Sequence, residues 1–252
     1  MGHGILARAV LDHVTIRASD RAASELFYDT VLRTIGGEQT GRDEQYTVWN
    51  GDFSLANADD HNPVTRRLHV GFMAPSKEHV DAFWRAGTAA GYEDDGPPGP
   101  RPQYSPSYYG AFLLDPDGNS AEAVHHDAVR EAGRIDHLWI RVGDVGAAKE
   151  FYEKVTPIGG FRLNRELDNR VQFTAPTGSV SFVAGEPTEN VHLAFEATDN
   201  ETVDAFHRSL TQAGYRDNGA PGERAIYHPG YYGAFVLDPD GNNVELVNHN
   251  RG

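Results

Sequence analysis

The chain has 252 residues, a formal net charge of −15 and no cysteine. Its length suits one or two domains, and its 39% of hydrophobic residues can form a core. The missing cysteines exclude disulfides, thiolate metal sites and a cysteine nucleophile. The acidic charge argues against nucleic acid and anionic membranes as partners. No apolar run reaches the roughly 20 residues that span a bilayer, and the first residues lack signal-peptide features, so we expect a cytoplasmic protein.

The pattern in the first half of the chain predicts two successive units, each with a strand, a helix and further strands in that order. The first strand, Leu11 to Arg17, alternates and places His13 on the same face as Thr15. A helix begins near Asp20, and either Ser19 or Asp20 can cap it. Its expected buried stripe comprises Ala23, Leu26, Phe27, Thr30 and Val31. The remaining predicted elements are strands at 45–49, 52–56 and 67–73, a helix from about 76, and strands at 110–114 and 120–124.

The second half repeats the first. Residues 108–119 (YYGAFLLDPDGN) match residues 231–242 (YYGAFVLDPDGN) at eleven of twelve positions, with an offset of 123. The period is too long for a solenoid repeat, so each copy is expected to be a domain. We place the two domains at residues 1–129 and 130–252. The chain then contains four βαβββ-like units, two in each copy.

Two histidines and one glutamate recur at strand positions of each copy. They are His13, His69 and Glu122 in the first copy, and His137, His192 and Glu245 in the second. Two imidazoles and a carboxylate from three strands form a facial triad, which leaves coordination positions open for water, oxygen or substrate. A single strand histidine is more often just hydrogen-bonded, but repetition at matched spacing favours a metal site in each copy.

The run HPGYYGAFVLDPDGNNVELV, with the upstream strands DHLWI and VHLAF, resembles the vicinal oxygen chelate (VOC) superfamily. That superfamily includes glyoxalase I, extradiol dioxygenases, fosfomycin resistance enzymes and bleomycin-binding proteins. The resemblance implies an α+β fold of two tandem VOC domains, each a pair of βαβββ modules forming a curved, cup-shaped mixed sheet. It also implies that the three ligands of each copy hold a divalent metal ion. Fe(II) is favoured for that ion, with Mn(II), Ni(II), Co(II) and Zn(II) left open.

Two departures from known subfamilies bear on the expected reaction. Neither GDFSLANA nor GSVSFVAG supplies the fourth, acidic ligand of a glyoxalase I, which favours an oxygenase or a fosfomycin-type transferase. The second copy nearly matches the extradiol signature from His228 to Glu245, but Phe235 stands where that family has tyrosine. We therefore predict dioxygenase-like chemistry on a small aromatic or vicinally oxygenated molecule. The alternatives are a glyoxalase-type lyase or isomerase, a transferase, and a metal-independent drug-binding protein.

The second copy also holds the candidate catalytic and pocket residues. His228 could act as a general acid or base, or could merely cap a turn, and Ser105 replaces it in the first copy. We therefore expect the first copy to be the weaker or silent one. The predicted substrate pocket comprises Trp139, Tyr227, Tyr231 and Phe235. The histidines after the last strands, at 125, 126 and 249, are expected to be exposed, and a homo-oligomer is left open.

Overall fold

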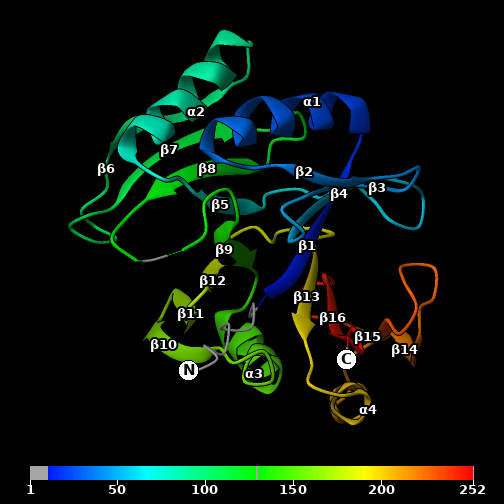
Figure 1. Cartoon of the computed structure of the whole chain (residues 1–252). Helices are drawn as coiled ribbons and strands as arrows, with labels where there is room; N and C mark the ends of the chain where they lie inside the picture. The colour runs from blue at the N-terminus through cyan, green and yellow to red at the C-terminus, as the bar shows by residue number, and fades with distance from the viewer. Residues whose placement is uncertain (1–10, 129, 252) are drawn as a thin grey trace, which may run out of the picture.

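The computed structural model describes residues 11–128 and 130–251, which form four βαβββ modules in chain order (Figure 1). The first module consists of β1 (Leu11–Ala18), α1 (Arg21–Leu32), a 3₁₀ turn (Arg33–Ile35), β2 (Gln39–Arg42), β3 (Tyr46–Trp49) and β4 (Phe53–Asn57). The second consists of β5 (His69–Met73), α2 (Lys77–Ala89), β6 (Asp94–Pro100), β7 (Tyr109–Leu114) and β8 (Ser120–His125). The third consists of β9 (Ile135–Val142), α3 (Val145–Val155), β10 (Arg162–Leu167), β11 (Arg170–Ala175) and β12 (Gly178–Ala184). The fourth consists of β13 (His192–Glu196), α4 (Asn200–Gln212), β14 (Asp217–Glu223), β15 (Tyr232–Leu237) and β16 (Asn243–Asn248).

The modules pair across the two copies rather than within them. The first sheet has the order β14-β15-β16-β13-β1-β4-β3-β2 and joins the first module to the fourth. The second sheet has the order β10-β11-β12-β9-β5-β8-β7-β6 and joins the second module to the third. The α+β fold of paired βαβββ modules is therefore confirmed, but the expectation that each copy closes its own cup is wrong. Both copies carry the same strand pattern, so the pattern is satisfied equally well by either pairing. The domain boundary between residues 129 and 130 stays a prediction, because Val129 lies outside the described residues.

One hydrophobic core joins the two sheets. Helices α1 and α4 contact the first sheet, and α2 and α3 contact the second. Helices α1 and α2 lie together on one side of the molecule, and α3 and α4 lie together on the other (Figure 1). Phe53 of β4 and Phe72 of β5 meet edge to face at 5.1 Å between ring centroids, although they belong to different sheets. The sheets thus share buried surface and should fold together. No helix of the described residues is long and apolar enough to cross a membrane.

The repeated DPDG turn fastens each sheet to a helix of the other. The Tyr28 hydroxyl on α1 donates a hydrogen bond of 2.9 Å to Asp115, in the turn between β7 and β8. Tyr152 on α3 donates to Asp238 in the same way and at the same distance. Burial raises the pKa of both aspartates, and their carboxylates accept further hydrogen bonds from backbone N–H groups of their own turns. The motif is therefore a structural clamp between the sheets.

Two local expectations from the sequence are wrong. Leu26 is 63% exposed, and Tyr28 takes the buried position because its hydroxyl reaches Asp115. The strands β6, with three prolines, and β14, with one, are not among the predicted elements. Both are edge strands, where a residue without an N–H group breaks no ladder bond. The cap at Asp20 is confirmed, since its side chain accepts a hydrogen bond from the Ala23 N–H group.

We expect Tyr152→Phe to lower the free energy of unfolding by about 1–3 kcal/mol, because it removes a donor from the buried Asp238. Tyr232→Phe is the matched control. Its hydroxyl donates to Asp204 on α4, nearer the surface, so this change should cost less than about 1 kcal/mol. Urea unfolding of both variants checks this. Equal losses would show that the turn does not clamp the sheets.

Candidate metal centres

Each sheet gathers two histidines and one glutamate on neighbouring strands. The first centre comprises His13 of β1, His192 of β13 and Glu245 of β16. The second comprises His69 of β5, Glu122 of β8 and His137 of β9. Within each group, the atoms that could bind a metal all lie within 4.8 Å of one another. All six predicted ligands are thus brought together, but the predicted grouping by copy is wrong, because β1 pairs with β13 and β5 with β9. Their role as ligands stays a prediction.

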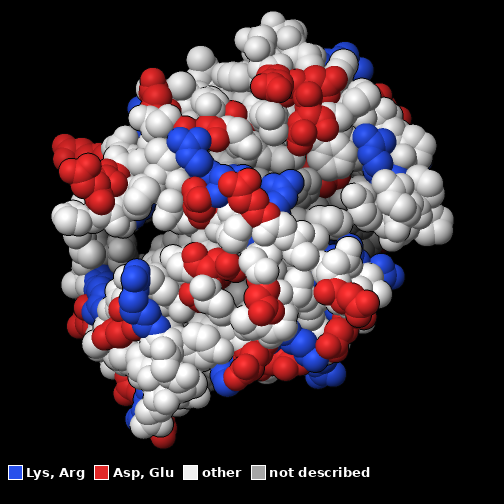
Figure 2. Space-filling view, turned by 180° about the vertical axis from the view of Figure 1, so that it is seen from behind, with Lys and Arg blue, Asp and Glu red and all other residues white. Residues whose placement is uncertain are grey.

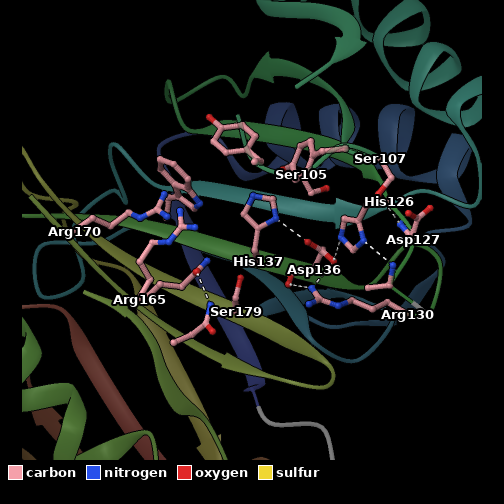
Figure 3. Close-up of a pocket in the computed structure, with 16 residues that line it drawn as sticks. Ser105, Ser107, His126, Asp127, Arg130, Asp136, His137, Arg165, Arg170 and Ser179 are labelled. Carbon is pink, nitrogen blue, oxygen red and sulfur yellow. Dashed lines mark hydrogen bonds and ion pairs between the residues drawn. The ribbon is translucent and has the colours of Figure 1, made fainter. Parts of the chain in front are cut away.

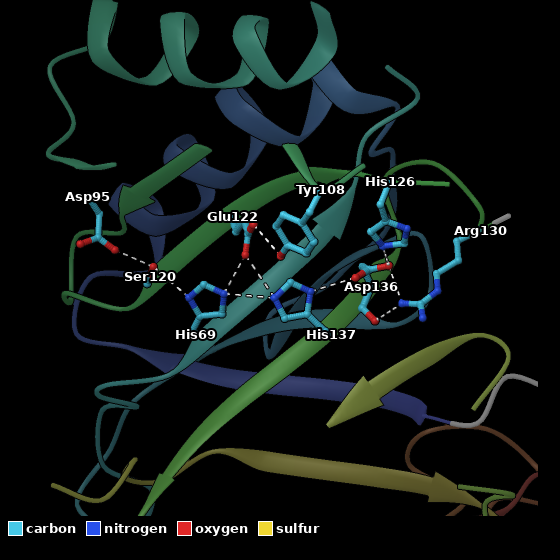
Figure 4. A network of polar contacts seen from close by, with 9 residues as sticks. All are labelled: His69, Asp95, Tyr108, Ser120, Glu122, His126, Arg130, Asp136 and His137. Atoms are coloured by element: carbon cyan, nitrogen blue, oxygen red, sulfur yellow. Dashed lines mark hydrogen bonds and ion pairs between the residues drawn. The ribbon is translucent and has the colours of Figure 1, made fainter. Parts of the chain in front are cut away.

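In the second centre the three polar ends converge on one point (Figure 4). The Glu122 Oε2 atom lies 3.0 Å from the Nε2 atom of His69 and 3.1 Å from that of His137. The two Nε2 atoms are 3.2 Å apart. Burial opposes charge on His137, but hydrogen bonds to Asp136 and Glu122 raise its pKa to about 9. Burial likewise opposes charge on Glu122, yet hydrogen bonds from both histidines lower its pKa to about 2.

The first centre is more open. His192 Nε2 lies 2.9 Å from Glu245 Oε2, and His13 Nε2 lies 3.8 Å from the same oxygen. Glu245 is fully buried. Burial lowers the pKa of His192. For His13, burial also opposes the charged form, but the hydrogen bond to Asp12 raises its pKa.

An aspartate precedes one histidine of each centre and fixes its orientation. Asp12 accepts from His13 Nδ1 at 2.6 Å, and Asp136 accepts from His137 Nδ1 at 2.8 Å. With Nδ1 protonated, each Nε2 lone pair faces its centre, which is the arrangement that metal-binding histidines usually have. The sequence signal for this role is the Asp-His dipeptide, which occurs at the same place in both copies.

Two of the histidines expected to be exposed lie behind these aspartates. His249 Nε2 lies 2.7 Å from Asp12, and His126 Nε2 lies 3.0 Å from Asp136. Both side chains are largely buried. The expectation of exposure is therefore wrong for these two residues, because each follows a last strand that lies only one strand away from the first strand of the other copy, where its aspartate stands.

The repeated Tyr-Tyr-Gly sequence positions each glutamate. The Tyr108 hydroxyl donates to Glu122 Oε1 at 2.8 Å, and Tyr231 donates to Glu245 Oε1 at 2.7 Å. A Cβ atom on Gly110 would lie 2.4 Å from that Glu122 oxygen, so the glycine leaves room for the carboxylate; Gly233 does the same for Glu245. One carboxylate oxygen is thus held by tyrosine, and the other faces the histidines.

These features fit a divalent cation. Each centre offers two imidazole nitrogens and one carboxylate oxygen, and in the described part of the chain neither group contains a fourth His, Asp or Glu. A buried carboxylate is costly without a compensating charge. In the second centre the two Nε2 atoms and the Glu122 Oε2 atom lie within 3.2 Å of one another, and a metal ion can take all three as ligands.

The predicted pocket residues divide between the two centres. The cavity of about 330 Å³ beside the first centre is lined by Tyr227, His228 and Tyr231. Trp139 instead lines two cavities beside the second centre, one of about 430 Å³ (Figure 3) and one of about 300 Å³. Phe235 is absent from the lining of the first cavity, and its ring stands edge-on to His192 at 6.0 Å. A single pocket holding all four predicted residues is therefore wrong, again because the modules exchange partners.

His228 connects to the first centre through other polar side chains. Its Nε2 atom lies 2.9 Å from His249 Nδ1, and His249 in turn contacts Asp12, the partner of His13. Its Nδ1 atom lies 2.8 Å from the carbonyl oxygen of Pro229 in its own loop. The imidazole therefore lines the cavity and also braces its loop, and its catalytic role stays a prediction.

The comparisons with known proteins agree with this architecture. The family model of the Glyoxalase/Bleomycin resistance protein/Dioxygenase superfamily matches residues 10–123 and 134–246. A point mutant of glyoxalase I from Zea mays is similar in structure, with a TM-score of 0.68, 21% identity, and coverage of 95% of this chain and 92% of that one. A Bacillus subtilis protein provisionally described as a dioxygenase has a TM-score of 0.65 at 12% identity, covering 96% of this chain and 86% of that one. Both show likeness of fold alone. No curated protein matches the chain.

Divalent metal should bind the second centre more tightly as the pH rises from 7 towards 9. His137 has a raised pKa of about 9 and must lose its proton to bind metal, so the affinity should rise by up to about tenfold per pH unit. Metal titration of His192→Ala, which retains only the second centre, measures this. In His69→Ala, which retains the first centre, the ligand His192 has a lowered pKa and therefore needs no deprotonation above pH 7. An affinity of the second centre that is constant over this range would contradict the prediction.

Proposed function

Because the chain belongs to the glyoxalase/bleomycin resistance protein/dioxygenase superfamily, we propose that it is a divalent-metal-dependent enzyme with two centres. Each centre would hold a small, vicinally oxygenated molecule. The observation that carries this proposal is the pair of three-ligand groups, each with a buried glutamate and each beside a cavity. A binding protein without chemistry would have no use for two buried carboxylates surrounded by histidines.

At the first centre we propose dioxygenase-like chemistry with Fe(II). A metal ion on His13, His192 and Glu245 would polarise a chelating substrate and leave a position for oxygen. The protein's own groups would bind and orient that substrate. Tyr227 contributes an aromatic wall. His228 also lines the cavity, and a proton that it accepts or returns would be shared with His249 through its Nε2 contact.

A lyase or isomerase is the second candidate, and Phe235 favours it. This ring stands beside His192 at the position where the extradiol signature has a tyrosine hydroxyl. A reaction that needs only polarisation of the substrate by a metal does not require that hydroxyl. Such a reaction consumes no oxygen, so oxygen uptake separates the two candidates.

Metal analysis of paired variants tests which residues act together. The wild type should bind two ions per chain, one in each group. His13→Ala and His192→Ala should each lose one ion, and so should the double variant, because both residues belong to the first centre. His13→Ala combined with His69→Ala should lose both ions. Loss of only one ion from that last pair, or of two from the first pair, would contradict the grouping across copies.

Oxygen uptake tests the reaction. Protein loaded with Fe(II) should consume oxygen in the presence of a catechol, and His228→Gln should lower kcat by about 10²-fold, since it removes a general acid or base. Ser105→Ala is the matched control at the equivalent position of the second centre, and it should leave turnover at the first centre intact. If no catechol or related diol supports oxygen uptake, the dioxygenase proposal fails. Turnover of a thiol adduct or an epoxide with another divalent metal would then support the second candidate.

A further inference from the structure

Two arginines without acidic partners lie at one end of the second centre's cavity. Arg165 lies on β10 and Arg170 on β11, and both line that cavity (Figure 3). In the described part of the chain, neither guanidinium makes an ion pair with a carboxylate. The buried Nε atom of Arg170 also has no hydrogen-bond partner. The aspartates that line the same cavity, Asp127 and Asp136, lie at its other end with Arg130 (Figure 3), so none of the described carboxylates pairs with the two arginines.

Other arginines of the protein show the more usual arrangement. Arg21 pairs with Glu25, Arg134 with Asp52, and Arg130, at the opposite end of the same cavity, with Asp136. On the face shown in Figure 2, acidic and basic side chains are interspersed rather than segregated. The unpaired state of Arg165 and Arg170 thus does not follow from any shortage of carboxylates.

The sheet register places the two arginines beyond an aromatic side chain next to the metal ligands. His69 is directly opposite Trp139, and the same row continues through Ser181 and Gln172 to Arg165. Residues paired in this way point to the same face of a sheet. Trp139 lies 6.2 Å from the His69 ring, and the Arg170 guanidinium lies 5.1 Å from the Trp139 ring. The metal-ligand candidate His69, the indole of Trp139 and the guanidinium of Arg170 therefore lie in sequence along the cavity wall.

The first centre lacks this arrangement at the equivalent positions. In its row, His192 is opposite Thr15, and the row continues through Ser54 and Val48 to Gly41. Thr15 thus stands for Trp139, and Gly41 stands for Arg165. The position of Arg170 is taken by Tyr46, and Asp43 adds a negative charge to the lining. The cation pair belongs to the second centre alone.

The positive charges of Arg165 and Arg170 repel each other. Burial and the neighbouring Arg165 lower the pKa of Arg170, which is half-buried, whereas Arg165 is exposed. A bound anion would relieve this repulsion and would give the orphaned Nε–H group a partner. A guanidinium binds a carboxylate through parallel hydrogen bonds. Trp139 and Tyr104, whose rings meet edge to face at 5.6 Å, give the cavity an aromatic wall against which an aromatic ring can pack.

We propose that the second centre takes aromatic carboxylates, with the carboxylate held between Arg165 and Arg170 and the ring against Trp139. The assignment rests on the proposed function for the opposite end of the bound molecule. Its ring oxygens would face His137, which lines the same cavity, and through it the other two ligands, His69 and Glu122, which line the adjoining one. The first centre, with Gly41 and Tyr46 in place of the arginines, would take uncharged phenolic molecules. The two centres of one chain would then differ in substrate charge.

The carboxylate site is tested first without metal. Benzoate binding to protein treated with a chelator is measured by calorimetry for the wild type, Arg170→Gln and Arg165→Gln/Arg170→Gln. The double variant should bind benzoate at least about tenfold more weakly than the wild type, because charge-assisted hydrogen bonds are lost. Arg85→Gln removes the same charge from the exposed face of α2 and should leave the affinity unchanged. Unchanged affinity in the double variant, with the fold intact by circular dichroism, overturns the proposal, as does tighter binding of phenyl phosphate than of benzoate.

The second test compares catechol with 3,4-dihydroxybenzoate, which differ only in the carboxylate. In His192→Ala loaded with Fe(II), the carboxylate-bearing compound should bind about tenfold more tightly than catechol, and this ratio should approach one when Arg165→Gln/Arg170→Gln is added. A ratio near one without the arginine changes overturns the proposal. The two tests separate the failures: arginine-dependent benzoate binding in protein that takes up no metal would sink only the proposed function. Metal uptake without carboxylate preference would sink only this inference.

Discussion

The pairing of β1 with β13, and of β5 with β9, is the constraint on which the rest of the structure depends. Each pair joins strands from different copies at the middle of an eight-stranded sheet. The histidines of each centre come from these middle strands, so the pairing decides which ligands meet. It also decides which loop faces which cavity. Each sheet therefore contains one module from each copy, and each candidate metal centre combines residues of both copies.

The repeated motifs hold the two sheets and the buried glutamates in place rather than supplying reactive groups. The DPDG turn ties each sheet to a helix of the other through a buried tyrosine–aspartate bond. The Tyr-Tyr-Gly sequence holds one oxygen of the buried glutamate and leaves space beside it. Near-identity between the copies is thus explained by geometry around a buried carboxylate, where a displaced hydroxyl or an added Cβ atom would be costly.

The parts that differ between the copies lie around the centres rather than in them. The metal ligands, the aspartates beside them and the tyrosines are of the same residue types at both centres. The walls differ: Thr15 in the first sheet occupies the position equivalent to Trp139 in the second, and Tyr46 occupies the position equivalent to Arg170. Duplication followed by change of the walls gives one chain two similar centres with different surroundings. His228 lines the cavity of the first centre, and its counterpart Ser105 lines a cavity of the second. The predicted difference between the two copies is therefore a difference between the two centres, each of which contains residues of both copies.

The sequence by itself determined the duplication, the βαβββ order of the modules and the six candidate ligands, because strand alternation and a repeat of 123 residues are visible in the letters. It also indicated the absence of an acidic fourth ligand. Only the tertiary structure decided that His13 meets His192 instead of His69, and that Trp139 and His228 serve different cavities. The physical reason is symmetry: His13 and His137 occupy equivalent strand positions, so either pairing yields two histidines and a glutamate in each cup. A contact that distinguishes the pairings, that of His249 on Asp12, joins residues 237 positions apart in the chain, and no local pattern encodes it.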